Sequence, residues 1–288
     1  MTNPKSINKA IEESKCHYVI HCASPFPLES PKTEAEIVEP AVIGTTAVMK
    51  SAFHAGWKGV VVTSSCAAIE EFSGGKNIEV DETHWHNPDG GVSLPYYKSK
   101  VMAEKAAWDF YDSIDAKHKE TFTFNTVHPG FVTGPVKVKL TGTSQAVITG
   151  IFNGAITQFP HLYTSVVDIR DVASAHVKAL TICTGKRLVL STGNYSFSEI
   201  VEVLQKEYND KGYNIRFSNP PLCMLWVFSV FGGDVRFYYR RWGLKWVICP
   251  DNTKKILGVE DYIPMEQSLK DMAESLMDLG YVERKEAK

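Results

Sequence analysis

A tyrosine and a lysine four residues apart have the types and the spacing for acid–base chemistry. Tyr96 and Lys100 fall in the stretch LPYYKSKVMAEKAAW, which has the pattern of a helix start. On a helix these two side chains lie on one face, one turn apart. A phenol has an unperturbed pKa of about 10, so it exchanges a proton near neutral pH only beside a group that stabilises the phenolate, as a lysine does. Tyr97 is the weaker candidate, and the alternative is the solvated end of an ordinary helix.

The elements that must position these residues alternate between strand and helix. Buried strands are predicted at HYVIHCASP, GVVVTSSCAAI and TFTFNTVHPGFVTGP, because continuous apolar, β-branched runs are typical of a parallel sheet. A helix ending at Gly56 separates the first two, and the helix with Tyr96 precedes the third. The intervening residues 71–95 are expected to form a loop. This alternation indicates an α/β fold, a doubly wound parallel sheet, whose ligands bind where the strands end, here at ASP, TSS and HPG.

Taken in order, these motifs resemble the extended short-chain dehydrogenase/reductases, the NAD(P)-dependent epimerase/dehydratase family. Within that family they are similar to the dihydroflavonol 4-reductases and cinnamoyl-CoA reductases. The matching segments cover essentially the whole chain and are VIHCASPFP, EPAVIGTTAVMKSA, VVTSSCAAI, VDETHW, YYKSKVMAEKAAW, VHPGFVTGP, VVDIRDVASAHVKAL, DNTKKILG and SLKDMAESLMDLG. The resemblance implies a Rossmann-like enzyme that reduces an aldehyde or ketone to an alcohol with hydride from NAD(P)H. NADP is the expected cofactor and NAD is the alternative.

The resemblance also implies a role for each site residue. Ser65 would hydrogen-bond the substrate carbonyl, Tyr96 would give its proton to the carbonyl oxygen, and Lys100 would lower the pKa of the tyrosine and hold the nicotinamide ribose. By the same resemblance, Tyr96 and not Tyr97 is the proton donor. The implied cofactor-binding residues are Ala23, Ser24, Pro25, Thr63, Ser64, Tyr96, Lys100, Pro129, Gly130 and Val132.

One motif of dinucleotide-binding folds does not occur in the sequence. Such folds open with a strand, a G-x-G-x-x-G-type loop and a helix that holds the pyrophosphate. The glycine clusters SGGK, DGG and TGT do not sit between a strand and a helix with that spacing. The chain is therefore expected to be a shortened reductase that lacks the first strands, roughly 60 or more residues. The alternatives are a catalytically impaired protein with a binding or structural role, and an epimerase or hydroxysteroid dehydrogenase of the same superfamily.

The predicted domain organisation has two parts. Residues 1–135 form a truncated dinucleotide-binding core that residues 164–195 join. Residues 136–163 and 196–288 form a smaller substrate-binding lobe. The aromatic-rich residues 225–246 are expected either to line a substrate pocket or to close the core.

Composition and charge exclude several classes of partner. The 31 basic and 33 acidic residues are well mixed and give a formal net charge of −2, which favours neither nucleic acid nor a membrane. The N-terminus is polar and acidic, unlike a targeting sequence. We expect a cytoplasmic protein, a monomer or homodimer, that acts on a small-molecule carbonyl compound. The six cysteines lack CxxC spacing and are expected as reduced thiols in the core.

No metal site is predicted. In CHYVIHC the cysteines Cys16 and Cys22 share one strand face while His17 and His21 share the other, so the four cannot converge on one ion. The pair His84 and His86 lies in a polar stretch and is interpreted as part of a solvated loop. His128 follows a strand and is interpreted as a structural residue outside the catalytic set.

Overall fold

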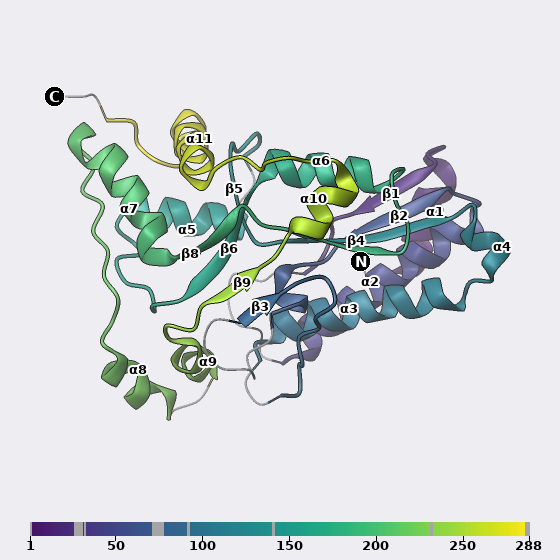
Figure 1. Cartoon of the computed structure of the whole chain (residues 1–288), viewed down its shortest axis with the longest axis horizontal. Coiled ribbons are helices and arrows are strands. Elements are labelled where there is room, and N and C mark those ends of the chain that lie inside the picture. Colours follow the sequence, from purple (N-terminus) through teal and green to yellow (C-terminus); the bar gives the residue numbers. More distant parts are fainter. Residues whose placement is uncertain are drawn as a thin grey trace.

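The structure is a computed structural model that describes residues 2–25, 31, 33–70, 78–90, 93–139, 142–230 and 233–285. It is an α/β fold, as the sequence predicts (Figure 1). Its main sheet has the order β1-β2-β4-β7, and all neighbouring strands are parallel. The four strands are β1 (Tyr18–His21), β2 (Gly59–Thr63), β4 (Thr123–Pro129) and β7 (Lys186–Leu190).

Helices cover both faces of this sheet, which explains why its strands are apolar throughout. Val60 and Val62 of β2 pack with α2 (Ala35–His54) and α3 (Pro95–Ser113), and α1 (Pro4–Glu13) joins them through Ile11. Val61, between them, points to the other face, toward α6 (Ile169–Ala179) and α10 (Asp251–Leu257). Figure 1 shows α6 and α10 on one side of the sheet and α2 and α3 on the other. The period-two alternation of a strand therefore fills two separate cores.

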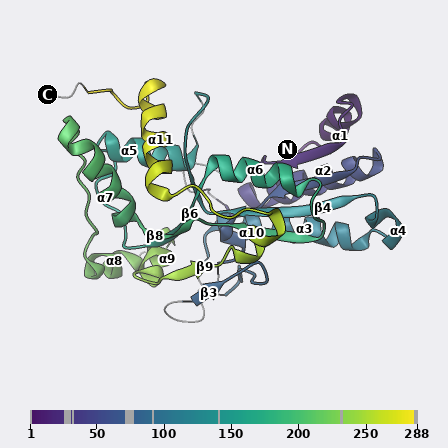
Figure 2. The ribbon, with the colours of Figure 1, turned by 45° about the horizontal axis from the view of Figure 1, so that its top comes forward.

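A second group of elements packs at the end of the main sheet where its strands finish. In its three-stranded sheet, β6 lies between β5 and β8, parallel to β5 and antiparallel to β8. This group consists of β5 (Phe131–Thr133), α5 (Thr143–Phe152), β6 (Tyr163–Asp168), β8 (Gly193–Ser196), α7 (Phe197–Tyr208) and α11 (Met265–Asp278). The other described elements are η1 (Cys66–Ala68), β3 (Ile78–Val80), α4 (Ala116–Lys119), η2 (Asn209–Lys211), α8 (Leu222–Ser229), α9 (Gly233–Arg241) and β9 (Trp246–Ile248). Figure 2 shows α5, α7 and α11 at the opposite end of the molecule from α1 and α4.

Local signals define several element boundaries. The Asp168 carboxylate caps α6 by accepting the Arg170 N–H at 2.8 Å. Ser196 and Glu199 form a reciprocal capping box at the start of α7. Gly56 ends the chain segment after α2 with a φ of 72°, a conformation that glycine adopts without strain.

Two expectations are wrong. Residues 71–95 are not loop throughout, because β3 lies within them and pairs with β9, more than 160 residues further along the chain. A three-residue strand has too short a pattern to be predicted without its partner. The cysteines are not all in the core either, since Cys16, Cys22 and Cys223 are exposed.

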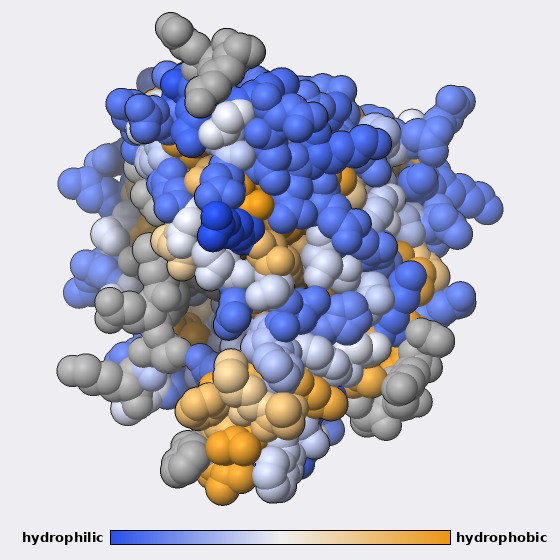
Figure 3. Space-filling view, turned by 90° about the vertical axis from the view of Figure 1, so that its left-hand side faces the viewer, coloured by the Kyte–Doolittle hydropathy of each residue, from blue (hydrophilic) through white to orange (hydrophobic). Residues whose placement is uncertain are grey.

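Helix α8 exposes apolar side chains on most of its surface. Leu225 is buried, whereas the exposed apolar residues in and beside the helix are Leu222, Met224, Trp226, Val227, Phe228 and Val230. Figure 3 shows hydrophobic side chains gathered at one end of this side of the molecule. This part of the aromatic-rich region therefore does not close a core. No helix within the described ranges combines the length and the apolar character needed to cross a membrane.

Candidate active site

The structure brings Ser65, Tyr96 and Lys100 together beyond the end of β2. Ser65 caps η1, its Oγ accepting the Ala67 N–H at 3.1 Å. Tyr96 lies in the first turn of α3, and a hydrogen bond with Ser65 connects the two side chains. Lys100 follows one turn later, with its Nζ 5.8 Å from the centre of the Tyr96 ring. Two hydroxyl groups therefore converge beside a buried cation, an arrangement that suits a carbonyl oxygen.

The pKa of Tyr96 favours the protonated phenol. Burial raises this pKa to about 12, and the hydrogen bond from Ser65 offsets only part of the increase. The resemblance implies that Lys100 lowers the pKa of the tyrosine, but burial dominates this pKa and Lys100 is not among the groups that shift it. At neutral pH the phenol therefore carries a proton that it can donate.

Lys100 is itself 8% exposed, and burial lowers its pKa to about 8. Its Nζ donates to the Thr63 carbonyl oxygen at 3.4 Å, which links α3 to the end of β2. A carboxylate, Glu104, lies one helical turn beyond it and opposes the decrease in pKa. The lysine thus keeps its positive charge at neutral pH in a largely desolvated place.

Glu104 was missed by the sequence analysis. It is 1% exposed, and His128 and Arg187 outweigh the effect of burial and keep the pKa of its carboxyl well below the usual range. Its oxygens accept hydrogen bonds from the side chains of Ser64 (2.6 Å), Trp108 (3.2 Å), Thr126 (3.2 Å), His128 (2.8 Å) and Arg187 (2.6 Å).

This carboxylate connects the two elements that carry the catalytic candidates. Ser64 directly precedes Ser65, and Glu104 lies on the same face of α3 as Tyr96 and Lys100. A glutamate between Ala103 and Ala107, on a helix face that packs on the sheet, is the signal that could have identified it.

The expected cofactor-binding segments lie at the ends of β1, β2 and β4. These ends are adjacent, since His21 pairs with Val62 and Thr63 with Val127. A small cavity there is lined by His21, Ala23, Ser24, Thr45, Val62, Thr63, Ser64, Lys100, Ala103 and Glu104. Pro25 continues the first segment and Pro129 ends β4. Val132, in contrast, packs against the core beneath α6.

Gly130 permits a close approach between the two sheets. A Cβ at this position would lie 2.3 Å from the Ser165 carbonyl oxygen. Any other residue would therefore displace the turn between β4 and β5, which is the segment expected beside the nicotinamide.

The histidines differ from expectation in one place. His86 is 4% exposed and bonds Glu70 O and the Ser93 hydroxyl, both at 2.8 Å, so it is not part of a solvated loop. His128 is fully buried against Glu104.

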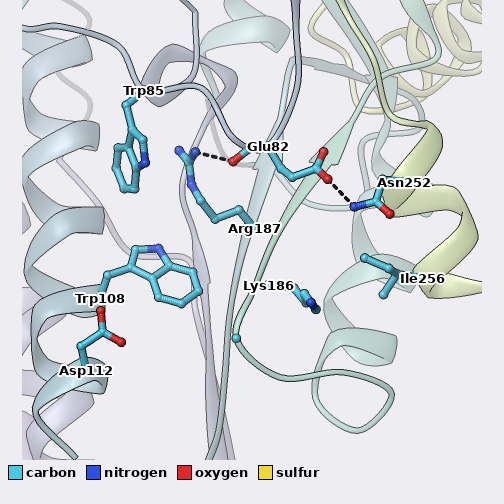
Figure 4. A pocket seen from close by; sticks show the side chains of 9 residues that line it. Glu82, Trp85, Trp108, Asp112, Lys186, Arg187, Asn252 and Ile256 are labelled. Atoms are coloured by element: carbon cyan, nitrogen blue, oxygen red, sulfur yellow. Dashed lines mark hydrogen bonds between the residues drawn. The ribbon is translucent and has the colours of Figure 1, made fainter.

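A larger cavity, of about 450 Å³, lies away from these groups near the start of β7 (Figure 4). The guanidinium carbon of Arg187 lies 3.8 Å from the centre of the Trp85 ring, and the same guanidinium donates to the Glu82 carbonyl oxygen at 2.7 Å. The cavity is lined by Glu82, Trp85, Trp108, Asp112, Gly185, Lys186, Arg187, Asn252 and Ile256. None of the three catalytic candidates lines it, whereas Lys100 lines the smaller cavity at the ends of β1 and β2.

Comparisons with known proteins identify the family of the chain. The sequence matches the 3-beta hydroxysteroid dehydrogenase/isomerase family over residues 1–191. It is 32% identical over 225 residues to a putative NADPH-dependent methylglyoxal reductase of Candida albicans, with 72% of this chain and 64% of that protein aligned. It is 31% identical over 271 residues to a cinnamoyl-CoA reductase of Medicago truncatula, with 91% and 74% aligned.

The solved structures include similar proteins as well. The structure of Gre2 from Candida albicans in complex with NADPH superposes with a TM-score of 0.75 at 28% identity, covering 96% of this chain and 80% of that one. The chain thus spans 64% of the length of the Candida relative and 74% of the Medicago relative.

Proposed function

The chain belongs to the 3-beta hydroxysteroid dehydrogenase/isomerase family, and we propose that it reduces an aldehyde or ketone to an alcohol with NADPH. The observation that carries the proposal is the convergence of Ser65, Tyr96 and Lys100 at the ends of the parallel strands. The names of the relatives, a methylglyoxal reductase and a cinnamoyl-CoA reductase, support the same reaction class. A role without catalysis would not require these three side chains in one place.

The bound nicotinamide would supply the hydride in this reaction. Ser65 and Tyr96 would both donate hydrogen bonds to the carbonyl oxygen and so orient the carbon for attack. As the C–H bond forms, the Tyr96 hydroxyl proton moves to the oxygen and completes the alcohol. The positive charge of Lys100 stabilises the phenolate that remains until a solvent proton replaces the one transferred.

Lys100 provides the best test of cofactor fit. Its buried ammonium group has three N–H donors, and the described contacts give it one hydrogen bond, the 3.4 Å bond to Thr63. Ribose hydroxyls would accept from the other donors, so this end of the site fits a nicotinamide nucleotide. Ala23, Ser24, Pro25, Thr63, Ser64, Pro129 and Gly130 would surround it.

We infer that cofactor binding and substrate binding are functions of different parts of the chain. Residues 1–135 and 164–195 would hold the cofactor, and residues 136–163 and 196–288 would shape the substrate pocket. We also propose a cytoplasmic location and a monomeric or homodimeric state.

Replacing Tyr96 tests the proposal. The purified chain should show a rise in melting temperature with NADPH, since a ligand of the folded state stabilises it. It should also oxidise NADPH in the presence of small aldehydes, followed by absorbance. Tyr96→Phe should lower kcat roughly 10²- to 10⁴-fold, the usual contribution of a general acid, while NADPH binding persists.

Tyr111→Phe, on the same helix, is the matched control and should keep its activity, because Tyr111 bonds Thr184 rather than the site. The proposal fails if a folded chain binds no NADPH, or if Tyr96→Phe turns over at the wild-type rate.

A further inference from the structure

Tyr97, the tyrosine next to the proposed proton donor, is bonded to a buried ion pair. Its hydroxyl donates to Glu70 Oε2 at 3.0 Å and accepts a hydrogen bond from Arg241 Nη1. The Nη2 of Arg241 lies 3.2 Å from the same carboxylate oxygen. Both charged side chains are 7% exposed, so they depend on each other and not on water. Burial raises the pKa of Tyr97 well above its usual range, so the phenol keeps its proton.

Aromatic rings enclose the guanidinium of Arg241. Its carbon lies 4.0 Å from the centre of the Trp246 ring and 4.7 Å from that of Phe237. The Tyr97 ring packs in turn between those of Phe237 and His86. The distances between ring centres are 5.3 Å to Phe237 and 5.2 Å to His86. An arginine paired with a carboxylate and stacked on rings in this way is held in one geometry.

The three bonded residues come from three different parts of the chain, two of which carry catalytic candidates. Glu70 follows η1, the turn that Ser65 caps, and its N–H donates to Cys66 O at 2.9 Å. Tyr97 adjoins Tyr96 in the first turn of α3. Arg241 is the last residue of α9. One buried cluster therefore joins the serine turn, the tyrosine helix and α9.

We propose that Arg241 is a positioning residue for carbonyl reduction, which holds Ser65 and Tyr96 in register through Glu70 and Tyr97. This inference rests on the proposed function. Misplacement of reacting groups by about 1 Å costs roughly hundredfold in rate, so a contact outside the site controls the reaction through geometry. Arg241 also contributes no atom to the reaction, so it is not a catalytic residue.

The cluster has an electrostatic consequence at Tyr96 as well. Burial is the main cause of the raised pKa of Tyr96, and the carboxylate of Glu70 adds to it. The titratable groups that the described contacts place beside Tyr96 include Lys100 and Tyr97 on α3, and Cys66 and Glu70 on the segment after β2. Of the groups bonded to Glu70, Arg241 carries the compensating positive charge.

Removing that charge tests the proposal. We expect Arg241→Met to lower kcat roughly ten- to hundredfold while the KM for NADPH stays within about twofold. In the reverse reaction, alcohol oxidation with NADP⁺, the pH of half-maximal rate should rise, because an uncompensated Glu70 disfavours the Tyr96 phenolate. Arg241→Lys should recover part of the loss. The control is Arg240→Met, which removes an exposed arginine from the same helix.

A second measurement does not depend on catalysis. Hydrogen exchange followed by mass spectrometry should show faster exchange in peptides covering 65–70 and 94–100 of Arg241→Met, and unchanged exchange in Arg240→Met. A wild-type chain without reductase activity would contradict the proposed function and leave this measurement intact. Unchanged exchange, or a wild-type kcat and pH profile in Arg241→Met, would overturn the positioning role.

A variant that leaves Glu70 buried without a partner can lose its fold. The double variant Glu70→Gln/Arg241→Met removes both charges and should remain folded. Its kcat should still be reduced, because the link to α9 is lost, whereas its pH profile should return toward that of the wild type. A folded double variant with the wild-type kcat would also overturn the proposal.

Discussion

At the scale of single residues, His21 shows how the site is desolvated. It is 7% exposed, and its Nε2 lies 3.2 Å from the Thr45 hydroxyl. Burial, assisted by the positive charge of Lys100, lowers its pKa from 6.5 to about 4. The imidazole is therefore neutral at physiological pH and adds no second positive charge beside the lysine.

This histidine should make the protein sensitive to acid. Between pH 6.5 and pH 4 the unfolded chain binds a proton at His21 that the folded chain does not, so stability falls as the pH falls. The loss from this residue should reach about 2 kcal/mol at pH 5. The free energy of unfolding can be measured with urea at pH 7 and at pH 5. Its decrease between the two pH values should be about 2 kcal/mol smaller in His21→Gln than in the wild type.

His54→Gln is the control, because His54 is exposed at the end of α2. An equal acid loss in the wild type and in His21→Gln would contradict the prediction.

The sequence predicted part of the residue-scale picture. The spacing of Tyr96 and Lys100 placed both on one helix face, and the structure has them there. The preference for Tyr96 over Tyr97 came from the family resemblance. The structure shows in addition that Tyr97 bonds Arg241, a residue 144 positions away. A pairing over that distance leaves no local pattern, so it was not predictable.

At the scale of elements, α3 is held to the sheet by a buried charge as well as by apolar packing. Glu104 on α3 pairs with Arg187 on β7 and His128 on β4. The helix is thereby fixed against two strands, and the catalytic candidates on it gain a defined position. Ser64 extends the same network to the turn after β2.

Removing this carboxylate should be strongly destabilising. Glu104→Ala leaves the Arg187 charge in the interior without its partner, and breaking a buried pair in this way typically costs about 3–5 kcal/mol. We expect urea denaturation to show a loss of that size. Asp109→Asn, an exposed change on the same helix, should stay within about 0.5 kcal/mol of the wild type. A loss below about 1 kcal/mol for Glu104→Ala would show that the network does not hold the helix.

The elements themselves were predictable to the extent that their patterns are long. The strands β1, β2 and β4 and the helices α2, α3 and α11 follow from apolar runs and helical periodicity. The short pair β3 and β9 was not predictable, because each strand has three residues and depends on the other. The cluster around Arg241 was not predictable for the same reason. The Arg241 guanidinium stacks on Trp246, and Trp246 belongs to β9.

At the scale of the whole molecule, α8 is unusual for a surface helix because its exposed face is apolar rather than polar. Trp226 is 57% exposed, Phe228 50% and Val230 74%. Surface residues of this kind contribute little to folding, whereas Leu225 on the same helix is 8% exposed.

Polar substitutions of the exposed residues on α8 should therefore lower the hydrophobicity of the surface without changing the stability of the fold. The triple variant Trp226→Gln, Phe228→Gln, Val230→Ser should elute much earlier from a hydrophobic-interaction column, with a free energy of unfolding within about 1 kcal/mol of the wild type. Leu225→Ser should instead destabilise the protein by about 2–4 kcal/mol. Unchanged column retention in the triple variant would show that another surface dominates.

The parallel order of the main sheet has a consequence for how the chain folds. No two neighbouring strands of this sheet are joined by a tight turn, because α2 separates β1 from β2, and α3 separates β2 from β4. Each strand pairing therefore requires the closure of a long loop. The entropy cost of this closure comes before the favourable contacts between the strands form. The shortest closure belongs to β1, α2 and β2, and β7 joins last in chain order. The longest closure lies between β2 and β4, the strands that precede Ser65 and Gly130, so we expect this pairing, which brings the two turns together, to form more slowly than that of β1 and β2.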